Sequence, residues 1–263
     1  MPGGARVTDH VEEFPAEVRS RLEDYLARMD RELPGALVGC YAVGSLALGD
    51  FSRVSNIDLV AVADETWDDT RLAQAGTAAA ALRRRGRPPS VAHVSWAELD
   101  CEPPSPRAGQ PGIGGAGSLN PLNRYLVGTG APPVRGPERP DVELRQGDIE
   151  TWAADEMRAR WAPLVRAARR PAALWMKRAL ADPVLDACRL YVATTGRYLS
   201  KVAAAETLLV ELPPAEGIQR VLREALSYWE GSSTSMYWGP VSRKKDALRL
   251  LSELLERVAR PAP

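Results

Sequence analysis

Two apolar runs joined by a short segment of small residues constrain the fold of this chain more than any other feature. The first run spans 36–43 and leads into Gly44 and Ser45, and the second spans 57–62 and carries Asp58 near its start. Both runs have the length and composition of β-strands. The link between them is too short for the helical crossover that joins parallel neighbours, which predicts a mixed sheet rather than a doubly wound one.

The flanking sequence supplies the rest of a small α/β unit. Apolar residues recur at intervals of three and four before the first run, and an alanine-rich segment that ends in three arginines follows the second. Two later stretches are dominated by proline and glycine, which predicts loops. The expected elements are helices at 15–33, 71–85 and 120–127, a third strand at 90–96, and loops at 103–117 and 128–140.

From about Asp141 onward the pattern is helical throughout, and Gly196, Pro213 and Gly231 are typical helix stops. We therefore predict an α+β protein in two domains. Residues 1–140 form a mixed sheet with helices, and residues 141–263 form an all-α helical bundle. The bundle helices are expected at 148–168, 172–180, 183–194, 200–212, 218–229 and 243–258.

Composition limits the class of ligand. Lys plus Arg and Asp plus Glu both total 34, so the net charge is zero and no overall field would attract nucleic acid or an anionic membrane. No apolar run approaches the roughly 20 residues of a membrane helix, the first residues do not resemble a secretory signal, and the cysteines lack metal-site spacing. We expect a cytoplasmic protein, a monomer or weak homodimer, that binds a small molecule and neither nucleic acid nor membrane.

The segment between the two strands has the residue types that phosphate and metal binding require. Gly44 permits close approach of the backbone to a ligand, and Ser45 offers both an N–H and a hydroxyl group, so this turn is a candidate phosphate site. Two side chains two residues apart on a strand share one face, and such a pair of carboxylates commonly holds Mg²⁺. Here those positions are Asn56 and Asp58.

The spacing of these residues resembles the signature of the nucleotidyltransferases, which is Gly-Ser followed by Ser-Asp-x-Asp. Within that superfamily the chain is similar to the streptomycin and spectinomycin (aminoglycoside) adenylyltransferases. The resemblance covers most of the chain. The matching residues are Gly44, Ser45, Gly49, Ser55, Asp58 and Leu59 in the first half, with Thr195, Gly196, Arg197, Ser200 and Lys201 in the second.

This resemblance implies an antibiotic-resistance type of transferase that moves AMP from Mg²⁺-bound ATP to a hydroxyl group of a small aminocyclitol or sugar-like acceptor. It also implies a nucleotidyltransferase-type sheet followed by a helical domain. By position, Gly44, Ser45 and Lys201 would bind the nucleotide, and Asp58 would hold the metal, with Asn56 as a weak second ligand.

The chain departs from the family at two carboxylates. Asn56 stands where the family has its first metal-binding aspartate, and the loss of a negative charge should weaken metal binding. The third strand, 90–95, has no acidic residue, although the family carries a carboxylate there. The acids that could replace it flank the strands: Asp50, Asp64, Glu98 and Asp100. No residue is assigned as the catalytic base.

The acceptor site is expected on the helical half, where Trp175, Asp182 and Asp186 are candidate substrate-binding residues. Lys177 and Arg178 lie close by in sequence, and they would repel a polycationic drug unless the acids face the ligand. The acceptor identity therefore stays open. The alternative is a catalytically inactive nucleotidyltransferase-fold protein that binds a nucleotide or small ligand in the interdomain cleft. A nucleotidyltransferase toxin or its partner is a weaker alternative, because a net charge of zero does not indicate a nucleic-acid-binding surface.

Overall fold

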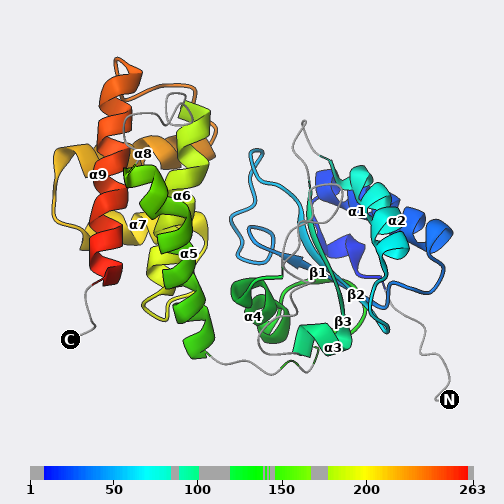
Figure 1. Cartoon of the computed structure of the whole chain (residues 1–263). Helices are drawn as coiled ribbons and strands as arrows, with labels where there is room; N and C mark the ends of the chain where they lie inside the picture. Colours follow the sequence, from blue (N-terminus) through cyan, green and yellow to red (C-terminus); the bar gives the residue numbers. More distant parts are fainter. Residues whose placement is uncertain are drawn as a thin grey trace. The chain divides into compact units, whose positions relative to one another are not determined.

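The structure is a computed structural model that describes residues 9–83, 89–100, 119–138, 140, 142, 146–166 and 177–259 (Figure 1). The chain forms two compact units. The first consists of Met1–Gly49 with Ser55–Leu144, and the second consists of Asp50–Val54 with Arg145–Pro263. The backbone therefore passes from one unit to the other at three places, two of which lie within the link between the first two predicted strands.

The first unit is built on a mixed sheet with the strand order β3-β2-β1-β4. β1 is antiparallel to both of its neighbours, and β2 is parallel to β3. This confirms the predicted mixed sheet, but the fourth strand falls where a proline-rich connection was predicted. The strands are β1 (Gly39–Val43), β2 (Asp58–Ala63), β3 (Ser90–Ser95) and β4 (Pro133–Arg135).

Helices cover the sheet on both sides (Figure 1). One face presents Tyr41, Val60 and Val94, which pack with Leu99 and Leu126 from the helices of that side. Alternate residues of the same strands point to the opposite face, as the two-residue period of a strand requires. The helical elements of this unit are η1 (Val11–Glu13), α1 (Ala16–Glu32), α2 (Asp69–Ala78), η2 (Ala79–Leu82), α3 (Trp96–Asp100) and α4 (Pro121–Thr129).

The second unit is helical throughout its described residues and packs around one apolar core. Its α6 continues through Pro183, where the sequence predicted a break between two helices. Val184, Leu185 and Cys188 of this helix are fully buried. Packing of that face offsets the roughly 3 kcal/mol cost of an interior proline. The helices are α5 (Gln146–Arg166), α6 (Lys177–Ala193), α7 (Lys201–Glu211), α8 (Glu216–Trp229) and α9 (Pro240–Ala259).

The predicted fold class, α+β with a mixed sheet followed by an all-α part, is confirmed. The division into independently folding domains 1–140 and 141–263 stays a prediction. No helix in the described part of the chain has the length and apolar composition needed to cross a membrane.

Candidate functional site

The end of β1 and the start of β2 bring the predicted phosphate turn next to the predicted metal ligand. Val43, the last residue of β1, pairs with Asp58, the first residue of β2. Gly44 follows at once with φ 62°, and a Cβ atom placed on it would lie 2.6 Å from Asp58 Oδ2. Only glycine fits here, because a side chain would be strained in this conformation and would also collide with the carboxylate.

The turn that begins at Gly44 closes on itself through a hydrogen bond from Leu48 N–H to the Gly44 carbonyl, 3.1 Å long. It ends at Gly49, which also has a positive φ, 74°. Ser45 lies inside this turn and is partly exposed. The backbone of the turn is thus ordered by its own hydrogen bond, with Ser45 accessible beside Asp58.

Asn56 and Asp58 lie on the same face of the chain where it enters β2. Ile57 and Leu59 are buried, each with 1% exposure, whereas Asn56 and Asp58 on either side of Ile57 are half-buried. Asn56 Oδ1 is buried and has no hydrogen-bond partner. A buried acceptor without a donor is costly, and a cation or a water molecule would satisfy it.

These two oxygen-bearing side chains could hold a weak Mg²⁺ site. Mg²⁺ is commonly bound through one or two protein oxygens, with water and substrate phosphates completing its shell. Within the described residues there is no group of three or more His, Cys, Asp or Glu side chains arranged to hold a metal. The described residues thus offer such a site one carboxylate and one neutral amide oxygen.

Three of the four acids proposed to compensate lie at the wrong end of the sheet. In the parallel pair of β2 and β3, Asp58 faces Ser90 and Ala63 faces Ser95. Asp64, Glu98 and Asp100 follow the distant ends of these strands, about 17 Å from Asp58 at the usual rise of a strand. The strand register therefore disfavours recruitment of these three acids to a metal ion at Asp58.

Glu98 also has a local structural role. Its Oε2 accepts hydrogen bonds from Ser95 N–H at 2.8 Å and from Ser95 Oγ at 3.0 Å, and Ser95 Oγ accepts one from Glu98 N–H at 3.2 Å. This reciprocal pair is a capping box at the start of α3. His93, in the middle of the same strand, makes an edge-to-face contact with Trp67, with the two ring centres 5.3 Å apart. Burial lowers the pKa of His93 to about 4.

Asp50, the fourth acid, belongs to the helical unit. Its Oδ2 accepts a hydrogen bond from Val202 N–H at 3.3 Å, in the first turn of α7, and its carbonyl accepts one from Trp229 Nε1 at 3.2 Å. Arg53 donates to the Gly231 carbonyl of the same unit. Asp50 Oδ1 is buried and has no hydrogen-bond partner. The segment that links the phosphate turn to β2 is therefore anchored on helices α7 and α8.

Lys201, the first residue of α7, lies between the two predicted substrate carboxylates. Its Nζ is 3.8 Å from an oxygen of Asp182 and 3.8 Å from an oxygen of Asp186. The ammonium also lies 5.9 Å from the ring centre of Trp229, within range of a cation–π interaction. The structure thus brings together residues that were predicted to bind different ligands.

Asp186 is already surrounded by cations. Its side chain is 9% exposed and lies 2.8 Å from Arg160 and 2.9 Å from Arg189, in addition to Lys201. Burial alone would raise the pKa of this carboxyl, but the three cations outweigh burial and hold the pKa below its usual value. An ammonium group of a ligand would have to compete with these partners. Trp175, the third predicted substrate residue, lies outside the described residues.

Sequence reasoning missed the anchoring role of Asp50 and the position of Trp229 beside Lys201. Neither feature is indicated by the residues that neighbour Asp50 or Trp229 in the sequence. Asp50 was considered only as a possible replacement for the missing carboxylate. Trp229 has the helical spacing of a core residue, which it also is, at 7% exposure.

No family model matches the chain, and no curated protein matches its sequence. Among solved structures the chain is similar to the spectinomycin adenyltransferase AAD(9) from Enterococcus faecialis, whose crystal structure was determined with ATP and spectinomycin. The TM-score is 0.60, the match covers 92% of this chain and 99% of that chain, and the sequence identity is 13%. This similarity establishes the fold and confirms the predicted resemblance to the aminoglycoside adenylyltransferases at that level.

Proposed function

We propose that this chain is a nucleotidyltransferase that transfers AMP from Mg²⁺-bound ATP to a hydroxyl group of a small aminocyclitol or sugar-like acceptor. The observation that carries the proposal is the placement of the Asp58 carboxylate against Gly44, in a chain that shares its fold with a spectinomycin adenyltransferase. In the reaction the acceptor oxygen bonds to the α-phosphorus, the bond from that phosphorus to the bridging oxygen breaks, and pyrophosphate leaves.

Residues of the sheet unit would position the nucleotide phosphates and the metal ion. Gly44 lets the backbone approach a phosphate, and Ser45 offers its N–H and hydroxyl groups to phosphate oxygens. Asp58 and Asn56 would hold Mg²⁺, which when bound neutralises charge on the leaving pyrophosphate. Lys201 is proposed to add a cation for the nucleotide. No side chain is assigned to remove the proton of the acceptor hydroxyl.

A second candidate is a protein that binds a nucleotide or small ligand without turnover. The observation that favours it is Asn56 together with the acid-free strand β3, since only one carboxylate remains where the family resemblance implies three. Calorimetry with ATP discriminates the two candidates. Binding that Mg²⁺ strengthens steeply supports the enzyme, and binding that Mg²⁺ leaves unchanged supports the binding protein.

The Asn56→Asp variant tests the enzyme directly, because it restores a second carboxylate beside Asp58. With ATP, Mg²⁺ and a panel that includes spectinomycin and streptomycin, we expect pyrophosphate release to rise at least about tenfold over the parent chain, equivalent to about 1.4 kcal/mol. Mass spectrometry of the acceptor should show the added AMP. Asn56→Ser is the matched control, since it changes the same side chain without adding charge. An inactive parent and an inactive Asn56→Asp variant would refute the proposal.

A further inference from the structure

Lys201 is held at its backbone and at its ammonium group by two residues of the same helical unit. The ring centre of Trp229 lies 5.9 Å from Lys201 Nζ. The N–H of the next residue, Val202, donates to Asp50 Oδ2 at 3.3 Å, and Trp229 Nε1 donates to the Asp50 carbonyl at 3.2 Å. These contacts form a closed set, because Trp229 joins the lysine side chain to Asp50, and Asp50 joins Trp229 to the start of α7.

Two carboxylates balance the charge of Lys201 without fixing its direction. Its Nζ lies 3.8 Å from Asp182 Oδ1 and 3.8 Å from Asp186 Oδ1. Both distances exceed the roughly 2.7–3.2 Å of a hydrogen bond, so the attraction has little directional character. The Lys201 side chain is 24% exposed and therefore stays open to a ligand. Its direction is left to the Trp229 ring and to the start of the helix.

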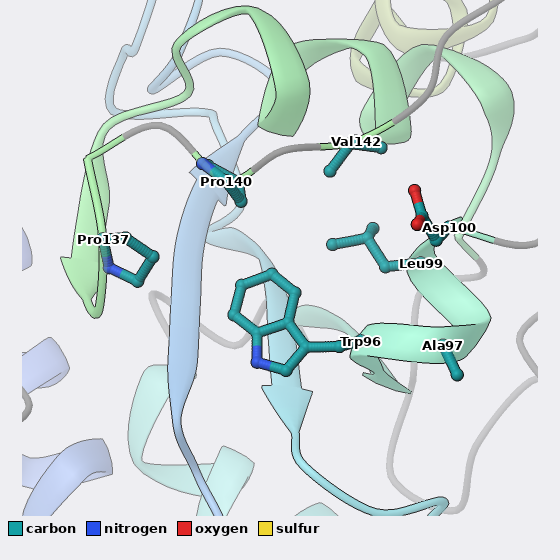
Figure 2. Close-up of a pocket in the computed structure, with 7 residues that line it drawn as sticks. All are labelled: Trp96, Ala97, Leu99, Asp100, Pro137, Pro140 and Val142. Carbon is teal, nitrogen blue, oxygen red and sulfur yellow. The ribbon is translucent and has the colours of Figure 1, made fainter. Parts of the chain in front are cut away.

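Trp229 differs from other described tryptophans in what its side chain contacts. Trp96 forms part of the wall of a cavity beside α3 (Figure 2), and Trp67 donates its N–H to a strand carbonyl. The ring of Trp161 lies 5.3 Å from the Arg160 guanidinium, but its buried Nε1 has no hydrogen-bond partner among the described residues. Trp229 combines the two kinds of contact, with its ring toward a cation and its N–H bonded to a carbonyl.

We propose that Trp229 and Asp50 are positioning residues that set the Lys201 ammonium for the phosphates of the nucleotide. This inference rests on the proposed function, which gives Lys201 that role. Trp229 is 7% exposed, and its bond to Asp50 fixes the plane of the indole. A cation is attracted to an indole face, and a long side chain that is ordered beforehand loses less freedom on binding. A positioning residue acts through its partner, so its effect on nucleotide affinity should disappear without Lys201.

NMR of the lysine side chains tests the positioning without any nucleotide. The chain has four lysines, so reductive dimethylation with ¹³C gives few resonances, and Lys201→Arg identifies the one of interest. Trp229→Leu and Asp50→Ala should each shift the Lys201 resonance. Trp161→Leu is the matched control, because Trp161 is also 7% exposed in the same unit and its ring lies near a different cation, and it should leave that resonance in place. An unshifted resonance in both Trp229→Leu and Asp50→Ala overturns the proposal.

Calorimetry with ATP and Mg²⁺ tests the consequence for the nucleotide. Lys201→Ala should weaken ATP binding about tenfold, the usual effect of losing a hydrogen bond to a charged group. Trp229→Leu and Asp50→Ala should each weaken it about three- to tenfold in the parent chain and less than about twofold in the Lys201→Ala background. Asp50→Asn keeps an acceptor for the helix and should stay within about twofold of the parent.

The two measurements separate this inference from the proposed function. Equal losses of ATP affinity with and without Lys201 would overturn the inference, because Trp229 and Asp50 would then act independently of the lysine. A parent chain that binds no ATP would refute the proposed function, and the Lys201 resonance would still decide whether the two residues position the ammonium. Circular dichroism of each variant confirms that the helices are retained.

Discussion

Replacing Gly44 with alanine tests whether the phosphate turn and Asp58 are packed as one site. The residue has φ 62°, a region that costs an L-residue about 1–2 kcal/mol. The added Cβ would also lie 2.6 Å from Asp58 Oδ2, so the carboxylate must move out of its position. The variant therefore carries two separate penalties, one in the backbone and one at the contact with Asp58.

The contact penalty can be estimated from the side-chain geometry. Rotating Asp58 away from a favoured rotamer costs about 0.5–1.5 kcal/mol. Together with the backbone term, Gly44→Ala should lower the free energy of unfolding by about 1.5–3.5 kcal/mol. Gly49→Ala is a matched control, because Gly49 has φ 74° and nothing lies within 4 Å of its added Cβ. That variant should show the backbone penalty alone, about 1–2 kcal/mol.

Urea unfolding of six proteins separates the two terms: the parent chain and the Asp58→Ala variant, each alone and with either Gly44→Ala or Gly49→Ala added. In that background the nearest remaining atom of residue 58 would be its Cβ, at 3.4 Å, which Ala can tolerate. Gly44→Ala should then cost no more than Gly49→Ala. The argument is refuted if the two glycine variants are equally destabilised when Asp58 is present, or if the cost of Gly44→Ala does not change when Asp58 is removed.

Two further changes test the buried polar groups. Glu224→Gln should lower the free energy of unfolding, measured with urea, by about 2–4 kcal/mol. The fully buried Glu224 carboxylate pairs with Arg243 at 2.8 Å, and the variant removes the negative charge of that pair. A loss below about 1 kcal/mol would argue against this reasoning. The pKa of His93 is about 4 in the folded protein, against 6.5 for an ordinary histidine. Between these pH values the unfolded chain binds one more proton than the folded chain. The free energy of unfolding should therefore fall by up to about 3 kcal/mol as the pH is lowered from about 6.5 to about 4. His93→Gln should remove that slope, and an unchanged pH dependence would exclude His93 as its source.

Regular periodicity made part of the fold predictable. In α1 the apolar positions at intervals of three and four are all buried, and they include Val18, Leu22 and Met29. The short link between the first two strands predicted a mixed sheet for a steric reason that tertiary packing cannot override. By contrast, β4 is three residues long and begins with a proline, so no alternation was available to detect it.

The local pattern failed where long-range packing decides the outcome. Pro183 is a typical helix stop, yet α6 continues through it because its neighbours in that helix are buried in the bundle core. The acids near the sheet show the same limit. Asp64 and Glu98 looked equivalent to other flanking acids until the strand register placed them at the far end of the sheet from Asp58.

The signature segment itself shows why a motif is an incomplete description of a site. In sequence, 44–58 is one continuous stretch, but Asp50–Val54 within it belongs to the helical unit. Asp50 satisfies an N–H group of the first turn of α7, and Trp229 donates to the Asp50 carbonyl. Val54 packs against the bundle core. Hydrogen bonds across more than 150 residues leave no trace in local spacing, so the sequence could indicate the phosphate turn but not its anchor.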